Sequence, residues 1–475
     1  MKRLLALWLA CLVPLVASAQ SKEFASKPLE ITDVTVIDTT GAAPRPGQSV
    51  TVEGGRISQV GDAKKVHAPK GAQVVNARGL YIIPGLWDMH VHVWETERTF
   101  PLFIANGVLG VRNMGGHLED LKRWRSQVIN GELLGPRMVI SGPLVDGLDP
   151  AHPDHSVVVH TPDEGRAAVD TLKQSGVDFI KVFDQLTPDE YKAIADECKK
   201  VGLPFAGHLP EGIWASDAST AGQLSIEHLL GSLEESSKNF DQIVRLSDGP
   251  APSPGERGAR ALAALRLEVN SLDPARLKQL ADLFAANKTW QVPTLVAGKA
   301  MAFLNDDATL KDPRLAYIGR ADQKQWSDLR NRLLAENPPE YWELRRAAFH
   351  EELAITREYH RDGVPMLAGT DAGGPPFVIP GFDLHEELAA LVGAGFTPLE
   401  ALQSVTLHAA QFLGRDDDFG TVANGKAADL VLLAANPLDD IRNTQKIRAV
   451  VVQGKYLDRG ALDGMLAQVK ASAGR

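Results

Sequence analysis

The stretch Ile82-Ile83-Pro84-Gly85-Leu86-Trp87-Asp88-Met89-His90-Val91-His92-Val93 decides the fold prediction for this chain. Most of its residues are apolar, which predicts a buried strand of a parallel sheet. Residues two apart point to the same side of a strand, so the imidazoles of His90 and His92 can reach one metal ion. By itself the pair is a weak signal, since histidines at strand ends are often hydrogen-bonded turn residues.

Seven further strand-like segments follow, and they alternate with helix-like segments, which favours parallel βα units. The eight expected strands cover residues 82–93, 108–114, 137–141, 178–183, 204–208, 224–228, 290–296 and 365–371. Eight parallel strands with helical returns predict an α/β protein built on a (β/α)8 TIM barrel.

Three helix starts repeat one capping pattern. Thr161, Thr187 and Thr397 are each followed by Pro, and Glu stands three residues after each Thr. Thr at the N-cap, Pro at the first helical position and Glu at the third are typical of helix N-termini. We therefore expect helices to begin directly after these three threonines.

Short β-rich runs at both ends of the chain predict a second, smaller domain. The runs near the start indicate a small antiparallel unit, and a matching pattern returns near the other end. The runs cover residues 31–37, 49–52, 57–60, 73–75, 429–433, 447–452 and 455–457. We expect residues 20–83 and 415–475 to build one small β-sandwich together.

The expected barrel covers residues 84–414, and two of its connections are too long for plain helical returns. These connections, about 229–289 and 297–364, have the composition of helical insertions. Because both follow strands, they emerge on the carboxyl face of the barrel, where active sites lie. They can serve as lids there, or they can simply add stabilising surface.

Residues 1–19 have the pattern of a secretory signal peptide. A short positive region and the apolar run 4–16 precede the small-residue cleavage site Ala17-Ser18-Ala19. We expect an exported, periplasmic or secreted protein that begins at Gln20; a lipoprotein attached through Cys11 is the weaker alternative. No later stretch reaches the ~20 apolar residues of a membrane helix.

Composition narrows the range of partners. The 475 residues carry 50 Lys and Arg against 60 Asp and Glu, a net charge of −10, which disfavours nucleic acid. Cleavage after Ala19 leaves Cys198 as the remaining cysteine, so no intramolecular disulfide is expected. A small molecule or short peptide is the expected substrate, and a homo-oligomer remains open.

Further histidines and one carboxylate end other expected strands. His208, His228 and Asp371 are the last residues of the fifth, sixth and eighth strands. Because the carboxyl ends of barrel strands meet at one rim, we expect these groups beside His90 and His92. The alternative for Asp371 is an N-cap of a following helix.

Lys181 lies among apolar residues in Phe179-Ile180-Lys181-Val182-Phe183, where an ammonium is expensive to bury. It can form a buried ion pair. Alternatively, a depressed pKa leaves a nucleophilic amine that takes up carbon dioxide and becomes an anionic carbamate between two metal ions. Oxygen and nitrogen ligands without cysteine suit zinc, and also manganese, cobalt or nickel.

These motifs together resemble the amidohydrolase superfamily of metal-dependent hydrolases over nearly the whole mature chain. The residues that carry the resemblance are Pro84-Gly85-Leu86-Trp87-Asp88-Met89-His90-Val91-His92, His208, His228, Gly369-Thr370-Asp371 and Gly425-Lys426-Ala427-Ala428-Asp429-Leu430-Val431-Leu432. The resemblance implies a (β/α)8 barrel with a small β-sandwich made from both termini.

The resemblance also implies a binuclear site with a hydroxide between two divalent ions as the nucleophile. Asp371 would be the catalytic residue, taking a proton from the hydroxide and passing it to the leaving nitrogen. The implied ligands are His90, His92 and Asp371 for the more buried ion, His208 and His228 for the more exposed one, and carboxylated Lys181 as the bridge.

Within the superfamily, the chain looks most like the peptidase-like and acyl-amino-acid-hydrolysing branches, which cleave an amide next to a carboxylate. Two departures weaken the transfer of a substrate: His408 stands where relatives often have Asn, and residues 183–185 lack a Gly-rich turn. Arg112, His152 and His155 are the candidates for gripping a substrate carboxylate, although each also fits a structural hydrogen-bonding role.

Two other classes of function stay open at this point. A cyclic-amide or lactone hydrolase would use the same site with a different pocket. A non-catalytic metal- or ligand-binding relative would keep the barrel without turnover, but the complete ligand set argues against it.

Overall fold

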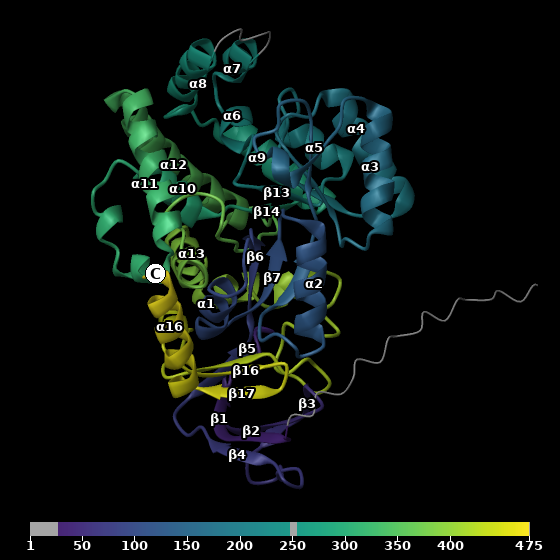
Figure 1. The fold of residues 1–475 in the computed structure, drawn as a ribbon, viewed down its shortest axis with the longest axis vertical. Coiled ribbons are helices and arrows are strands. Elements are labelled where there is room, and N and C mark those ends of the chain that lie inside the picture. The colour runs from purple at the N-terminus through teal and green to yellow at the C-terminus, as the bar shows by residue number, and fades with distance from the viewer. Residues whose placement is uncertain (1–26, 248–253, 475) are drawn as a thin grey trace, which may run out of the picture.

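The computed structural model describes residues 27–247 and 254–474 and has an α/β fold with two groups of parallel strands (Figure 1). The predicted signal peptide lies outside the described residues. One group joins β6 (Leu86–Val91), β7 (Val108–Asn113) and β8 (Arg137–Ile140). The second has the order β10-β9-β11-β12-β13-β14, with β9 (Leu144–Asp146), β10 (Ser156–Val158), β11 (Ile180–Val182), β12 (Phe205–Gly207), β13 (Ser225–Glu227) and β14 (Trp290–Val292).

The strand predictions hold for most of this α/β region, with three corrections. The expected strand 82–93 is two strands, because at Gly85 the chain passes from β5 (Tyr81–Pro84) of another sheet into β6. The short strands β9 and β10 were not predicted. The segment 365–371 is not a regular strand, since only Met366 and the following Ala372 form single parallel bridges.

Local chemistry explains why the last of these segments is irregular. Asp371 has a left-handed backbone (φ 61°), which interrupts β geometry. The Thr370 hydroxyl donates to Asp88 Oδ2 at 2.6 Å and accepts from the Ala372 backbone N–H at 3.1 Å. The segment nevertheless bonds to both neighbours, because Leu367 N–H donates to the Gln291 carbonyl and Asp371 N–H to the His90 carbonyl.

Helices return the chain between these strands. At the capping motifs, the Thr161, Thr187 and Thr397 side chains accept from the backbone N–H of the Glu three residues on, as predicted. The return helices and those near them are α1 (Thr99–Ala105), α2 (Leu118–Ile129), α3 (Pro162–Gln174), α4 (Pro188–Val201), α5 (Ala215–Ala221), α13 (Phe382–Gly393), α14 (Pro398–Ser404) and α15 (Leu407–Phe412).

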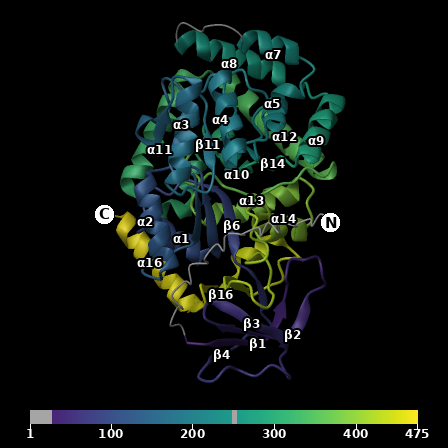
Figure 2. The same ribbon diagram turned by 90° about the vertical axis from the view of Figure 1, so that its right-hand side faces the viewer.

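The two long connections are largely helical where they are described. They contain α6 (Ser232–Glu235), α7 (Phe240–Ser247), α8 (Pro254–Glu268), α9 (Pro274–Asn287), α10 (Leu295–Ala302), α11 (Arg320–Glu336) and α12 (Pro339–Arg361). Figures 1 and 2 show α6, α7 and α8 gathered at the end of the molecule opposite the strands β1 to β4. Among the described residues, no helix combines the length and apolarity needed to cross a bilayer.

Both ends of the chain contribute to one further sheet, as predicted. Its order is β17-β16-β15-β5-β1-β2-β3, and β4 also pairs with β1. Its other strands are β1 (Leu29–Val36), β2 (Arg45–Glu53), β3 (Arg56–Asp62), β4 (Gln73–Asn76), β15 (Leu430–Leu433), β16 (Ile447–Val452) and β17 (Lys455–Asp458). The purely antiparallel prediction is wrong, because β4 and β5 pair with β1 in parallel.

This topology orients the parallel strands. Since β5 belongs to the sheet of the termini, β6 starts beside that sheet and runs away from it toward the helical insertions (Figure 1). The last helix, α16 (Arg459–Ala473), leaves the terminal sheet and packs against α1. Every residue of β6 and β7 is buried, which explains the nearly continuous apolar sequence of this region.

Candidate metal centre

The predicted ligands meet around one carboxylate at the carboxyl ends of the parallel strands. Asp371 Oδ1 lies 3.4 Å from Nε2 of both His90 and His92, and Oδ2 lies 3.9 Å from His228 Nε2. Candidate ligand atoms of His90, His228 and Asp371 all lie within 4.8 Å of one another. The His208 ring lies 4.9 Å from the His228 ring, edge to face. The five groups predicted at the rim therefore come together.

Three of the histidines are oriented by a partner on the other ring nitrogen. Such a partner fixes the tautomer and leaves Nε2 with its lone pair, the form that binds metal. The Nδ1 contacts are His90 with Glu227 Oε2 at 2.7 Å, His208 with Asp184 Oδ1 at 2.8 Å and His228 with Thr294 Oγ1 at 2.7 Å. None of these partners was predicted from the sequence, although Glu227 directly precedes His228.

Several nitrogen atoms at this centre are buried without any hydrogen-bond partner. They are Nε2 of His90, Nδ1 of His92 and Nζ of Lys181. A buried polar atom without a partner costs free energy, and such atoms are uncommon unless something else binds them. The donor set therefore fits divalent metal ions, which would complete the contacts of His90 Nε2 and of a modified Lys181.

Lys181 is fully buried in the middle of β11. Burial, together with the nearby Arg112 guanidinium, lowers the pKa of Lys181 to about 8, although Glu227 and Asp371 act in the opposite direction. The lysine stem needs the space at Gly207, where a Cβ would lie 2.9 Å from Lys181 Cδ and 2.3 Å from a backbone oxygen. A partly neutral amine in an apolar position is the form that reacts with carbon dioxide.

Burial keeps the imidazoles of His90, His208 and His228 neutral. Burial lowers the pKa of His228 to about 3 and, with the Lys181 charge, moves the pKa of His90 and His208 well below the usual value. Burial alone would raise the pKa of Asp371, but a hydrogen bond from His92 and the nearby Lys181 charge hold it below its ordinary range. Neutral imidazoles around an ionised carboxylate are the protonation states that bind zinc-like ions.

Backbone geometry fixes the loops that carry two of these groups. Asp371 and His228 both have left-handed backbones, with φ near 60°, which is uncommon outside glycine and asparagine. No described helix starts directly after Asp371, since the next one begins at Phe382. The alternative interpretation of Asp371 as a helix N-cap is therefore wrong.

Arg112 is placed differently from the prediction. Its side chain is only 1% exposed, and its Nη2 donates to both Glu227 oxygens at 2.8 and 2.9 Å. Its Nη1 donates to Ser225 Oγ and its Nε to the Met89 carbonyl. Arg112 thus lies inside the strands and holds the carboxylate that orients His90, which does not suit the predicted grip on a substrate carboxylate at the rim.

His152 precedes the short 3-10 turn Pro153–His155 and His155 ends it, and one aromatic ring separates each of them from a predicted ligand. The His155 ring lies 4.5 Å from Trp94, which is nearly parallel to the ligand His92 at 5.7 Å. The His152 ring lies 5.7 Å from Phe183, which stacks on the ligand His208 at 4.3 Å. Both histidines therefore lie close enough to reach a substrate bound at the centre.

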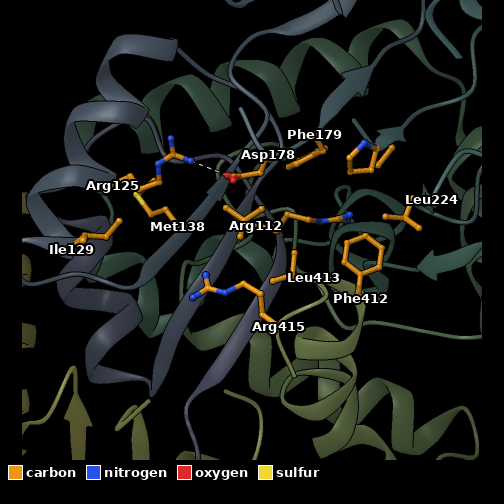
Figure 3. A pocket seen from close by; sticks show the side chains of 13 residues that line it. Arg112, Arg125, Ile129, Met138, Asp178, Phe179, Leu224, Phe412, Leu413 and Arg415 are labelled. Atoms are coloured by element: carbon orange, nitrogen blue, oxygen red, sulfur yellow. Dashed lines mark hydrogen bonds and ion pairs between the residues drawn. The ribbon is translucent and has the colours of Figure 1, made fainter. Parts of the chain in front are cut away.

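A cavity of about 540 Å³ lies at the opposite end of the strands and is distinct from the metal centre. Figure 3 shows Arg125 paired with Asp178 on one side of the cavity and the Phe412 ring on the other, with Arg112 between them. Most of the lining is apolar, including Met138, Phe179, Leu224 and Leu413. It contains none of the predicted metal ligands.

Comparison with known proteins agrees with this centre. The amidohydrolase family matches residues 81–457, so the chain belongs to that family. This membership supports a hydrolase that acts on carbon–nitrogen bonds.

Individual relatives are distant. Adenine deaminase of Rubrobacter xylanophilus is 38% identical over 92 residues, which is 19% of this chain and 15% of the relative. A solved bottromycin amidohydrolase is 25% identical with a TM-score of 0.72, covering 94% of this chain and 91% of the other. A solved Xaa-Pro dipeptidase with bound methionine is 21% identical with a TM-score of 0.66, covering 91% of this chain and 100% of the other, and it supports the fold alone.

Proposed function

We propose that this protein is a binuclear metal-dependent amidohydrolase that cleaves the amide bond of a dipeptide or an N-acyl amino acid. The observation that carries the proposal is the convergence of the His90, His92 and His228 imidazoles on Asp371, with His90 Nε2 and Lys181 Nζ buried and without a hydrogen-bond partner. Family membership and the structural likeness to a bottromycin amidohydrolase support the same reaction class.

Two divalent ions fit the number and kind of ligands. We propose zinc first, with manganese, cobalt and nickel as further candidates, because the ligands are nitrogen and oxygen without cysteine. The ions supply Lewis-acid activation of water and of the substrate carbonyl when they are bound. The proposed ligands are His90, His92 and Asp371 for one ion, His208 and His228 for the other, and carboxylated Lys181 for both.

The side chains of the protein then handle the protons. Asp371 is ionised and central, so it accepts the proton of the attacking water and returns it to the leaving nitrogen. Glu227, Asp184 and Thr294 hold the imidazoles in one tautomer throughout. Their fixed orientation keeps the nucleophile and the carbonyl aligned, which lowers the entropic cost of the reaction.

The proposal also specifies a free carboxylate on the substrate, next to the amide bond that is cleaved. His152 and His155 lie one ring from the ligand histidines and offer imidazole N–H donors to an anion. Arg112 no longer contributes, because its donors serve Glu227, Ser225 and the Met89 carbonyl. Of the two, His152 is the proposed carboxylate grip, because the His155 ring packs against Trp94.

We further infer a closed (β/α)8 barrel and a small β-sandwich as the framework. Backbone hydrogen bonds at both seams support closure: Asp178 N–H donates to the Ile140 carbonyl, and the segment 365–371 bonds to β14 and β6. For the leader we propose export after cleavage behind Ala19, so mass spectrometry of the exported protein should find Gln20 first. A lipid-bearing chain starting at Cys11 would refute that cleavage.

A substrate panel tests the proposed function. Metal-loaded full-length protein is assayed with dipeptides, N-acyl amino acids, cyclic ureides and lactones, and we expect hydrolysis of the first two classes. Amidating the substrate carboxylate should lower kcat/KM at least about tenfold, or ~1.4 kcal/mol. His152→Ala should lower kcat/KM by a similar factor for the substrate with a free carboxylate. It should lower kcat/KM little further for the amidated substrate. Equal rates on acid and amide would refute the carboxylate requirement, and selective turnover of cyclic ureides or lactones would replace the substrate class.

A further inference from the structure

An exposed indole lies directly beside the metal centre. Trp94 is 42% exposed, and it is the one aromatic side chain among the exposed large apolar residues of residues 27–247 and 254–474. It follows His92 by two residues, at a bend just beyond the end of β6, and its ring lies 5.7 Å from the His92 ring. A large apolar ring left in water at such a place suggests a contact with substrate.

The indole is held in one orientation. Its Nε1–H donates to the Gly373 carbonyl at 2.7 Å, which joins the end of β6 to the loop that carries Asp371. Gly373 has a positive φ of 92°, and a Cβ there would lie 2.1 Å from the His92 carbonyl oxygen, so this position requires glycine. A ring fixed before binding loses little conformational entropy when a ligand packs on it.

Other rings extend this surface away from the ligands. Trp94 is nearly parallel to His92, with an interplanar angle of 9°, and the His155 ring is tilted by 40° against it. The His117 ring meets His155 edge to face, 4.6 Å away. Burial and the neighbouring imidazoles lower the pKa of His155, which favours its neutral aromatic ring.

We propose that Trp94, His155 and His117 form a subsite for a flat aromatic group of the substrate, next to the amide that is cleaved. The inference rests on the proposed amide hydrolysis and narrows its substrates to amino acids that carry an aromatic acyl group or to N-acyl derivatives of aromatic amino acids. A saturated ring buries a similar apolar area, but an aromatic ring adds stacked and edge-to-face attraction. The proposed subsite can therefore be tested by comparing kcat/KM for substrates with an aromatic ring and with a saturated ring.

Matched substrate pairs test the subsite on both sides of the amide. The first pair is N-benzoylglycine and N-cyclohexanecarbonylglycine, and the second is N-acetylphenylalanine and N-acetylcyclohexylalanine. In at least one pair, we expect the aromatic member to have a kcat/KM about three- to tenfold higher. Trp94→Leu should bring that ratio close to one, and Trp94→Phe should retain most of it. Because the readout is a ratio, a general loss of folded enzyme does not change it.

Trp124→Leu is the matched control, because Trp124 lies on α2, where the helix carries none of the proposed ligands. We expect it to leave the ratio unchanged. Ratios near one in both pairs, or a ratio that survives Trp94→Leu, would overturn the subsite while amide hydrolysis stands. If no amide is hydrolysed, the proposed function fails. The subsite is then tested by calorimetric binding of benzoate and cyclohexanecarboxylate to the wild type and to Trp94→Leu. Equal binding of both acids to the wild type would overturn the subsite.

Discussion

The two ends of the parallel strands differ in whether their polar side chains have partners. At the amino end, every arginine of the cavity has an acidic partner: Arg125 with Asp178, Arg415 with Asp418 and Arg112 with Glu227. At the carboxyl end, His90 Nε2, His92 Nδ1 and Lys181 Nζ are buried without partners. At these two ends, the paired charges belong to supporting structure, and the unpaired buried nitrogens lie where we propose that metal ions bind.

One ion pair connects the two ends. Arg112 lines the cavity at the amino end and donates to Glu227, and Glu227 in turn contacts Nδ1 of His90 at the metal centre. The guanidinium and carboxylate are almost completely buried. Glu227 thus links the amino end to the metal centre through three hydrogen bonds, two with Arg112 and one with His90, and changes on either side of the Arg112–Glu227 pair should have different consequences.

The largest effect is expected at Lys181. Lys181→Ala removes the proposed bridging ligand and should lower kcat/KM roughly thousandfold, equivalent to ~4 kcal/mol. Added short carboxylic acids should restore part of the activity by occupying the vacated position. Lys181→Arg is the control, since arginine keeps the positive charge but cannot form the carbamate. Near-native turnover and metal content in Lys181→Arg would contradict the bridge.

Arg112 should matter for stability. Arg112→Met leaves Glu227 as an uncompensated buried charge and should lower the free energy of unfolding by about 3–5 kcal/mol in urea denaturation. Arg125→Met at the cavity edge breaks a partly exposed pair, and the same measurement should show about 0–1 kcal/mol. Similar losses for the two variants would remove the distinction between the buried pair and the surface pair.

Glu227 should act on metal binding. Glu227→Gln keeps the shape of the side chain but weakens the hold on His90 Nδ1, so metal affinity should fall about 10- to 100-fold in competition with a chelator. Asp178→Asn is the matched carboxylate-to-amide change at the amino end, and its metal affinity should equal that of the wild type. Unchanged affinity in Glu227→Gln would show that the imidazole does not need this partner.

The smallest effect is expected from filling the cavity. Leu413→Phe adds volume to a space of about 540 Å³ without forcing the strands apart. We expect kcat/KM within about twofold of wild type and a change in unfolding free energy below about 1 kcal/mol. A large loss of activity with unchanged stability would show that the amino end takes part in the reaction.

The sequence was a better guide to the side chains that meet at the metal centre than to the side chains that hold them in place. His208, His228 and Asp371 were found because topology alone brings the carboxyl ends of parallel strands together. Glu227 and Thr294 were missed, because hydrogen bonding to a particular ring nitrogen depends on side-chain directions that no spacing reveals. Arg112 was assigned to the rim for the same reason, although its guanidinium points between the strands.

Strand boundaries were limited by local backbone chemistry. The apolar pattern of residues 82–93 is continuous, but it hides the change of sheet at Gly85, where the N–H donates to the Asp429 carbonyl. Residues 365–371 also have a strand-like composition, yet the Thr370 hydroxyl and the left-handed Asp371 break the regular ladder. Periodicity reports burial, and it does not report which partner each backbone group finds.

The metal content of the purified protein tests the central claim most directly. The chain is isolated without chelators, desalted, and analysed by inductively coupled plasma mass spectrometry together with His208→Ala. We predict close to two divalent ions per wild-type chain and close to one in the variant, because the proposed ligands at the carboxyl end would hold two ions. A fully active wild-type protein with one tightly bound ion, or with none, would contradict the binuclear centre.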